Sequence, residues 1–248
     1  MLKVIINGYS GAMGKVLTKC VNEDSELELV CASSKDILEN VPFKTYPKMV
    51  DIKEKADVII DFSHHSAIND ILDYATKYKT PLVIATTGYN DDEVERIKDA
   101  SSIIPIFHCS NMSLGVNVLV KLVKEATKSL EGFDIEIIEK HHNKKLDSPS
   151  GTAVMIANGI HEVLPETEYT YGRYGRTEKR KTTEVGIHAI RGGTIVGEHT
   201  AIFAGHDEIL EIKHTAQSKD IFAKGAIMAA KFLVNQKAGY YNMDDILN

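Results

Sequence analysis

Short apolar runs alternate with amphipathic helical stripes along the first half of the chain. The run Leu2–Ile6 is typical of a buried strand, and the apolar positions between residues 13 and 21 recur at the spacing of one helix face. A second helical stripe covers residues 68–75, and four more apolar runs predict strands: Leu27–Ala32, Val58–Phe62, Leu82–Ala85 and Ile103–Phe107. Because these runs are rich in Val, Ile and Leu, we predict a parallel sheet with helices on both faces.

The pattern changes after Asn111. A helical stripe over residues 119–126 leads into a predicted strand at Ile135–Glu139, and from Val185 onward several strands follow one another with glycine-rich turns between them. Strands without intervening helices indicate a mixed or antiparallel sheet. A last stripe over residues 223–234 predicts a helix that returns to cover the first sheet. We therefore predict an α/β fold of two domains, residues 1–112 with 220–248 and residues 113–219.

Composition and charge exclude several classes of protein. The 248 residues are 43% hydrophobic and 26% charged, which is the balance of a globular protein rather than a disordered or collagen-like one. With 29 basic against 35 acidic residues the net charge is −6, whereas a general nucleic-acid binder usually carries a positive surplus. We therefore expect no nucleic-acid partner.

The apolar runs and the cysteines indicate in which compartment of the cell the protein is expected. No run approaches the roughly 18 apolar residues of a membrane-spanning helix, and Asn7-Gly8 interrupts the first run before it could form a signal peptide. The cysteines at positions 20, 31 and 109 are too far apart for a disulfide framework or a zinc-ligand pair. We expect a protein of the reducing cytoplasm, with no membrane partner.

Three glycines lie between the first predicted strand and its helix. Gly8, Gly11 and Gly14 have the spacing G-x-x-G-x-x-G, and Ser10 stands where the dinucleotide fingerprint G-x-G-x-x-G has its middle glycine. Small residues here let a pyrophosphate approach the N–H groups of a helix N-terminus. The alternative is a tight turn without a ligand. Because this is the first βα turn of a doubly wound pattern, we favour a dinucleotide.

The end of the second predicted strand bears on the choice of cofactor. A carboxylate there would hold the ribose hydroxyls of NAD, but Ser33-Ser34-Lys35 precedes the first acidic residue, Asp36. Ser34 followed by Lys35 would tolerate the 2′-phosphate of NADPH, although Lys35 could also be a solvated loop residue.

Residues 139–153 form the most unusual segment of the chain. It follows a predicted strand, contains His141, His142 and Lys145, and leads through Pro149-Ser150-Gly151-Thr152 into a helix. The helix start offers N–H and hydroxyl donors to an anion, and the histidines and lysine add proton donors and positive charge. This combination predicts a site for a carboxylate substrate.

Other interpretations of this segment are weaker. Adjacent histidines in an extended chain point to opposite sides, and no suitably spaced Cys or third His completes a zinc site. Surface histidines and a solvated basic face remain alternatives. The junction of two histidines, a lysine and a glycine cap favours a functional site, without a metal.

At this point the residues resemble a known family. The segments 141–145 and 147–153 resemble the signature of the dihydrodipicolinate reductase family, of the diaminopimelate route to lysine. The resemblance extends over nearly the whole chain, through five further segments: 7–14, 85–88, 110–117, 196–200 and 222–226.

The resemblance implies a fold and an activity. It implies a Rossmann-like dinucleotide-binding domain completed by the last helix, and a mixed-sheet α+β domain that binds substrate and forms a homotetramer. It also implies hydride transfer from NADPH or NADH to a small cyclic dicarboxylate, 4-hydroxy-tetrahydrodipicolinate.

The resemblance also implies roles for individual residues. His141 would be the proton donor and Lys145 its electrostatic and proton-transfer partner. The residues implied to hold the two carboxylates are His142, Ser150, Gly151 and Thr152. The residues implied or expected to contact the cofactor are Gly8, Tyr9, Ser10, Gly11, Ala12, Met13, Ser34, Lys35, Ala85, Thr86, Thr87, Cys109, Ser110, Asn111 and Met112.

Two departures from the family pattern concern the adenosine end of the cofactor. Ser34 stands where members often have an acidic residue, and Ser63-His64 stands where some carry an arginine. The basic stretch of residues 173–181 could close over the site, but a solvated loop is the favoured interpretation. Two alternative functions stay open: another nicotinamide-dependent reductase or amino-acid dehydrogenase, and a catalytically silent nucleotide sensor.

Overall fold

The computed structural model describes residues 1–175 and 179–248, which form two compact units. Unit 1 contains Met1–Ser113 and Lys219–Asn248, and unit 2 contains Leu114–Ser218. Unit 1 is therefore assembled from two stretches of chain that are far apart in the sequence.

Unit 1 is built on a seven-stranded sheet with the order β12-β6-β5-β4-β1-β2-β3. The strands are β1 (Leu2–Asn7), β2 (Leu27–Ser33), β3 (Lys44–Tyr46), β4 (Val58–Asp61), β5 (Leu82–Ile84), β6 (Pro105–His108) and β12 (Gly239–Tyr241). Every neighbouring pair is parallel. The order reverses between β1 and β4, and ligands of doubly wound sheets bind outside the carboxyl ends of the strands at such a switch point.

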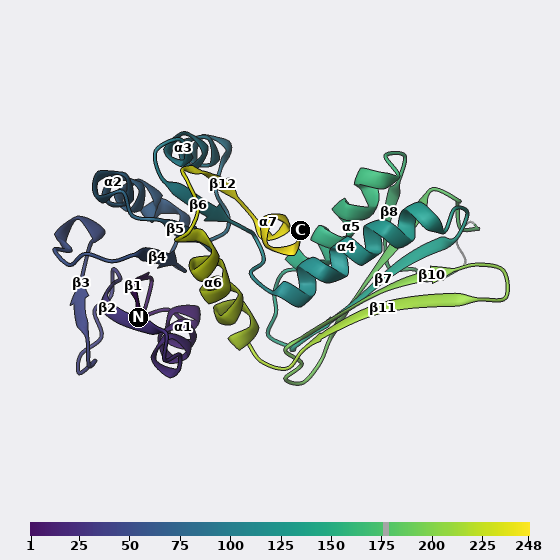
Figure 1. Ribbon diagram of the computed structural model, residues 1–248. Coiled ribbons are helices and arrows are strands. Elements are labelled where there is room, and N and C mark those ends of the chain that lie inside the picture. The colour runs from purple at the N-terminus through teal and green to yellow at the C-terminus, as the bar shows by residue number, and fades with distance from the viewer. Residues whose placement is uncertain (176–178) are drawn as a thin grey trace. The chain divides into compact units, whose positions relative to one another are not determined.

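Helices cover both faces of this sheet, as the apolar runs predicted (Figure 1). They are α1 (Ala12–Glu23), α2 (Ile68–Tyr78), α3 (Asp91–Ser101), α6 (Asp220–Leu233) and α7 (Met243–Leu247), with 3₁₀ turns at Met49–Asp51 and His65–Ala67. Helices α1 and α6 share a core with one face, and α2 and α3 with the other. The predicted return of the last helix is confirmed, since Ala226 and Leu233 are fully buried in the same core as Val4.

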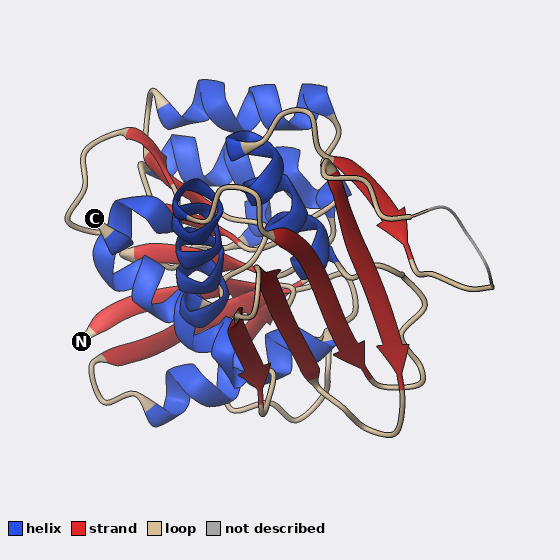
Figure 2. Ribbon diagram, turned by 90° about the vertical axis from the view of Figure 1, so that its right-hand side faces the viewer, coloured by secondary structure: helices blue, strands red, loops and turns tan. Residues whose placement is uncertain are grey.

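Unit 2 has a five-stranded mixed sheet with the order β11-β10-β7-β9-β8 (Figures 1 and 2). Its elements are α4 (Leu114–Ser129), β7 (Asp134–His141), α5 (Gly151–Val163), β8 (Glu168–Tyr171), β9 (Glu184–Arg191), β10 (Gly197–Ala204) and β11 (Ile209–Ala216). Strand β10 is antiparallel to β7 and β11, while β7, β9 and β8 are parallel. The predicted mixed sheet is confirmed.

Strand β7 alternates between the two faces of this sheet. Ile135 and Ile137 are buried in the core that includes residues of α4 and α5, and Glu139 and His141 continue the same row. Because side chains at every second position share a face, the helix-covered face carries two polar residues at the end of β7.

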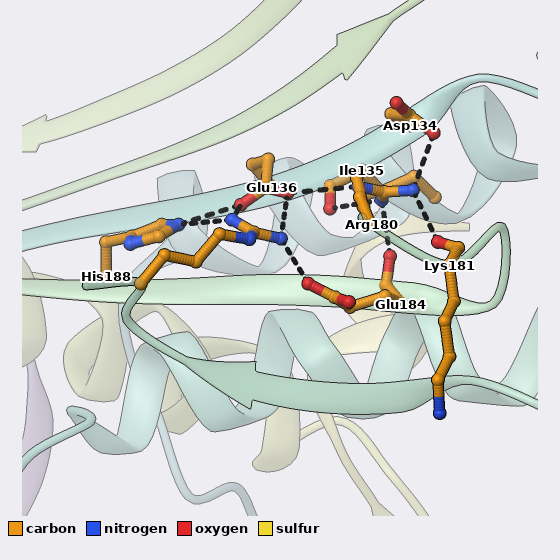
Figure 3. Close-up of polar contacts among 8 residues, drawn as sticks. Asp134, Ile135, Glu136, Arg180, Lys181, Glu184 and His188 are labelled. Carbon is orange, nitrogen blue, oxygen red and sulfur yellow. Dashed lines mark hydrogen bonds and ion pairs between the residues drawn. The ribbon is translucent and has the colours of Figure 1, made fainter. Parts of the chain in front are cut away.

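The opposite face of β7 carries an ion-pair network centred on Glu136 (Figure 3). Arg173 donates to both carboxylate oxygens of Glu136 at 2.8 Å, and His188 Nε2 lies 2.7 Å from Oε2. Arg180 joins Glu136 to Asp134. A side chain at position 186 would collide with Glu136 Oε2, at 1.9 Å from its Cβ, so Gly186 makes room for this carboxylate.

Most of the described residues of the stretch 173–181 are exposed, as the solvated-loop interpretation expects, but three of its basic residues are paired with carboxylates. Arg173 and Arg180 are held by carboxylates, and Lys181 pairs with Glu168 at 3.0 Å. Lys179 is exposed, and Arg176 lies outside the described residues.

Replacing Glu136 with glutamine should lower the free energy of unfolding at pH 7 by about 2 kcal/mol. Burial alone would raise the pKa of Glu136, but hydrogen bonds from Arg173 and His188 outweigh burial and lower the pKa to about 2. A depressed carboxyl pKa gives stability that is present above the unfolded value and disappears as the pH falls through the folded value. The difference between wild type and variant should therefore narrow between pH 4.5 and 2.

Urea unfolding at pH 7 and pH 3 measures this difference. Glu211→Gln is the matched control, because Glu211 is exposed on β11 and should give little difference at either pH. An equal destabilisation by Glu136→Gln at both values would contradict the assignment.

Among the residues that the structure describes, no helix is long and apolar enough to span a membrane.

Candidate functional site

The glycine turn of unit 1 joins β1 to α1. Gly8 has a φ of +85°, which favours glycine, and a Cβ there would lie 2.4 Å from the Phe62 carbonyl oxygen. A Cβ at Gly14 would lie 2.1 Å from the carbonyl oxygen of Gly8, whereas at Gly11 the same atom would be 3.4 Å away. Gly8 and Gly14 are thus required by packing, and Gly11, the N-cap of α1, leaves the helix N-terminus uncovered.

A cavity of about 480 Å³ opens beside this turn, at the carboxyl ends of β1, β2 and β4. Five predicted cofactor residues line it: Gly8, Ser10, Gly11, Ser34 and Lys35. The hydroxyl oxygens of Ser10 and Ser34 are 2.6 Å apart. Two further lining residues, Lys48 and His64, were not predicted as contacts. The cavity has the place and the donors that the adenosine end of a dinucleotide requires.

A buried carboxyl lies beneath the turn. Asp61 is fully buried, accepts from Asn7 Nδ2 at 2.8 Å and from the Thr86 hydroxyl at 2.7 Å, and burial raises its pKa. The Thr86 hydroxyl also accepts from the Ser63 N–H at 2.9 Å. The side chain of Thr86 is therefore directed into the unit and positions the loops after β4 and β5.

The remaining cofactor candidates differ in exposure. Tyr9 and Met112 are each 2% exposed and belong to the core, so their side chains do not line the cavity. Ala12 and Met13 form the first turn of α1. The two remaining groups follow the carboxyl ends of neighbouring strands, Ala85 and Thr87 after β5 and Cys109, Ser110 and Asn111 after β6. Of these, Thr87 and Ser110 are exposed.

In unit 2, Glu139 is the centre of the polar cluster. Its carboxylate lies 2.6 Å from His141 Nδ1, and Arg191 donates to both of its oxygens at 2.7 Å. The Ser150 N–H donates to Oε1 at 3.0 Å. Register explains the assembly, because His141 of β7 lies directly opposite Arg191 of β9.

Ser150 and His199 extend this cluster. Ser150 is the N-cap of α5, and its hydroxyl oxygen accepts from the Ala153 N–H and lies 2.8 Å from His199 Nε2. The His199 ring packs edge-on against that of His141, with centroids 5.1 Å apart. The Ser150 side chain is thus engaged by the cap and by His199.

The remaining predicted residues are Lys145, predicted as catalytic, and the substrate-binding candidates His142, Gly151 and Thr152, which lie in the loop after β7 and at the start of α5. Lys145 Nζ pairs with the exposed Asp147 at 2.8 Å, and Gly151 is exposed at the first position of the helix. His142 and Thr152 are half-buried. The two adjacent histidines differ in burial as expected from strand alternation, with His141 enclosed and His142 partly open to solvent.

Three titratable groups in the cluster, His141, His199 and Glu139, have shifted pKa values. Burial lowers the pKa of His141, and the hydrogen bond that its ring makes to Glu139 offsets only part of this effect. Burial lowers the pKa of His199 to about 4, so this ring is neutral at pH 7. For Glu139, burial acts to raise the pKa, but Arg191 and His141 outweigh it and the net shift is downward.

Glu139, Arg191 and His199 had no predicted role. A signal for Glu139 was present, since a carboxylate in the inward row of an apolar strand needs a buried cation. Arg191 and His199 depend on which strands pair with β7, and the apolar pattern does not specify that pairing. Among the described residues, no group of three His, Cys, Asp or Glu side chains could hold a metal ion.

Comparisons with known proteins show which family the chain belongs to. Residues 2–112 match the family model described as dihydrodipicolinate reductase, N-terminus, and residues 115–247 match the one described as its C-terminus. A protein of Caldanaerobacter subterraneus subsp. tengcongensis named 4-hydroxy-tetrahydrodipicolinate reductase is 55% identical over 248 residues, covering 100% of this chain and 98% of its own. A protein of the same name from Clostridium tetani is 46% identical over 250 residues, with the same coverage.

A solved structure supports the fold. Dipicolinate-bound dihydrodipicolinate reductase from Paenisporosarcina sp. TG-14 superposes with a TM-score of 0.83 at 22% identity, covering 99% of both chains. The predicted fold class and the predicted resemblance are confirmed. Because both family models match and together span nearly all of the sequence, this chain belongs to the dihydrodipicolinate reductase family.

Proposed function

We propose that this protein reduces 4-hydroxy-tetrahydrodipicolinate to tetrahydrodipicolinate with NAD(P)H, in the diaminopimelate route to lysine. The observation that carries the proposal is the cluster at the start of α5, where His141, Lys145 and the helix N-terminus meet. We assign cofactor binding to unit 1, and substrate binding and homotetramer formation to unit 2. The cytoplasm is the proposed location.

The substrate carries two carboxylates, and the cluster offers matching donors. The first N–H groups of α5, at Gly151 and Thr152, point out of the helix end and favour an anion. The Lys145 ammonium group pairs with the exposed Asp147 in the free protein, and it would pair with a substrate carboxylate instead when substrate binds. His142, half-buried beside them, would contact the second carboxylate.

The 4-hydroxyl group of the substrate leaves as water, and reduction of the resulting unsaturated ring then needs a hydride and a proton. A bound nicotinamide cofactor supplies the hydride. The ring carbon next to the reduced position takes a proton, which His141 would deliver as a general acid. The lowered pKa of His141 leaves it largely unprotonated at pH 7 in the free protein, and the negative charge of bound substrate raises its pKa again. Lys145 holds the substrate's negative charge during the transfer.

The direct test is oxidation of NADPH by the pure protein, with and without the product of a dihydrodipicolinate synthase reaction. Oxidation that depends on this product supports the proposal. Oxidation with an unrelated keto or imino acid would favour another nicotinamide-dependent reductase, and cofactor binding without turnover would favour a nucleotide sensor. The sensor has no need of Lys145 together with the start of α5.

The dicarboxylate pocket should bind 2,6-pyridinedicarboxylate competitively with substrate. Its two carboxylates match the donors at the start of α5 and Lys145, so we expect binding about tenfold tighter than that of pyridine-2-carboxylate, which has one. Calorimetry in the presence of reduced cofactor measures both affinities. Equal affinities for the two compounds would contradict a site for two carboxylates.

The cofactor preference should be for NADPH, by about tenfold or 1.4 kcal/mol. Ser34 and Lys35 line the cavity at the end of β2, where an acidic residue would repel the 2′-phosphate. Lys48 adds a second cation to the lining and Asp70 of α2 adds one carboxylate, so the lining keeps a surplus of one positive charge. Surface lysines are screened by salt, so the preference should shrink as ionic strength rises.

Kinetic constants for both cofactors at two salt concentrations measure the preference. Lys35→Ala should remove most of it without harming use of NADH, and Lys98→Ala, in the last turn of α3 outside the cavity, is the control. A clear preference for NADH at low salt would mean that another group holds the adenosine ribose.

A further inference from the structure

Four hydrogen bonds occupy the Glu139 carboxylate, and they come from three different segments. Arg191 of β9 contributes two, the Ser150 N–H at the start of α5 contributes one, and His141 of β7 contributes the fourth. The Glu139 side chain has 0% exposure. A carboxylate has about four acceptor directions, so this one is saturated by its protein partners.

These partners keep Glu139 ionised. A buried carboxylate is tolerated when a cation and further donors satisfy it, and the two-pronged bond from Arg191 is the strongest form of such pairing. An ionised carboxylate can only accept hydrogen bonds. The hydrogen between Glu139 Oε2 and His141 Nδ1 therefore belongs to the imidazole.

We propose that Glu139 is a positioning residue for the reaction: it fixes His141 with Nδ1 protonated, so that Nε2 is the atom that gives the proton to the substrate. Through the Ser150 N–H the same carboxylate holds the N-terminus of α5, which would receive a substrate carboxylate. This inference rests on the proposed function. It adds a residue that touches neither substrate nor cofactor and acts through its neighbours.

The surroundings of Nε2 are consistent with this role. A Cβ at position 197 would lie 3.1 Å from His141 Nε2, so glycine at the start of β10 avoids a tight contact with this nitrogen. The Ser150 hydroxyl lies beside Nε2 of His199. Nδ1 of His141 faces Glu139. Nε2 is thus the His141 nitrogen directed away from Glu139.

The charged and titratable groups that face His141 come from four segments. Glu139 raises its pKa, whereas Lys145 and Arg191 lower it. His199 of β10 faces it edge-on, and His214 of β11 lies directly opposite His199. Removing the negative charge of Glu139 leaves the cations in place, so the pKa of His141 should fall further. A general acid must be protonated, and the loss of activity with rising pH should then begin at lower pH.

If Glu139 only stabilised the fold, its replacement would not change the pKa or the tautomer of His141. Glu136 provides the matched control, because it lies on the same strand, is paired with arginines, and faces the opposite side of the sheet. Glu136→Gln and Glu139→Gln each remove one negative charge from β7. Only Glu139→Gln should change the tautomer and the pKa of His141.

The first measurement is the tautomer of His141, read from the side-chain ¹⁵N shifts and assigned with a His141→Gln sample. Wild-type protein above pH 7 should show the Nδ1–H form, and Glu139→Gln should move His141 toward the Nε2–H form. Wild-type protein with His141 in the Nε2–H form would overturn the proposal whatever the variants do, so the test does not depend on a variant that folds.

The second measurement is the pH profile of kcat. We expect Glu139→Gln to lower kcat by about 10- to 100-fold and to move the alkaline decline by roughly one pH unit toward lower pH. The dissociation constant for NADPH should stay within a few-fold. Glu139→Asp keeps the charge and should restore the position of the decline, although its shorter side chain will not restore the full rate. Glu136→Gln should leave the profile in place.

The possible outcomes distinguish a wrong proposed function from a wrong positioning role of Glu139. A wild type with the Nδ1–H tautomer that does not oxidise NADPH with the synthase product refutes the proposed function and upholds the geometry. An active wild type whose pH profile is the same in Glu139→Gln refutes the positioning role and leaves the function intact.

Discussion

Replacing His141 with alanine lowers kcat by about 100-fold or more and leaves NADPH binding nearly unchanged, because general acid catalysis is typically worth at least that factor. Lys145→Ala has an effect of similar size, since it removes the cation that holds the substrate's negative charge. Both residues lie in unit 2, and the glycine turn lies in unit 1, so the dissociation constant for NADPH should move little. Steady-state kinetics and cofactor fluorescence measure the two quantities separately.

Neighbouring residues of the same type provide the controls. Lys144 is exposed beside Lys145, and His206 is exposed in the turn between β10 and β11. Lys144→Ala and His206→Ala should therefore keep kcat close to that of wild type. If His141→Ala and Lys145→Ala also retain turnover within a few-fold, neither residue takes part in the chemistry.

The fold could be predicted where the apolar pattern is strong. Strand β4 is buried throughout, β1 and β2 are buried on both faces at their carboxyl ends, and all three lie within two residues of the predicted runs. Helix α3 was not predicted, because its sequence is strongly polar and its first turn is acidic. The capping box formed by Asn90 and Glu93 was a signal for its start. Strands β3 and β12 have three residues each, too short to show a period.

The candidate site could be predicted where its residues are close together in the sequence. His141, Lys145 and Ser150 share one segment between a strand and a helix. In the structure Glu139 links His141 to Ser150, and Lys145 is close enough to lower the pKa of His141. Arg191 and His199 are brought in by the register of β9 and β10 against β7. Strand order and register are set by packing of the whole sheet, so one sequence without its pairings cannot specify them.

The glycine turn gives the second large expected effect. Gly14→Ala should lower the free energy of unfolding by about 3 kcal/mol, because its Cβ would lie 2.1 Å from the Gly8 carbonyl oxygen and 2.5 Å from Tyr9 Cα. Both atoms belong to the backbone, and relief requires α1 to move away from the turn. Such a movement would also displace the donors that the pyrophosphate needs.

Gly11→Ala separates packing from ligand binding in the same motif. Its Cβ would meet only the Gly8 carbonyl oxygen at 3.4 Å, which is an ordinary contact, so the free energy of unfolding should change by less than about 1 kcal/mol. The added methyl stands at the N-cap of α1, beside the cavity, and should weaken NADPH binding by about tenfold, since a pyrophosphate bound there needs close approach to the backbone. Urea unfolding and cofactor titration of the two variants measure both effects. A Gly11→Ala protein that binds NADPH as tightly as wild type would show that the pyrophosphate does not contact this helix start, and an undestabilised Gly14→Ala protein would show that the turn can relax around the new side chain.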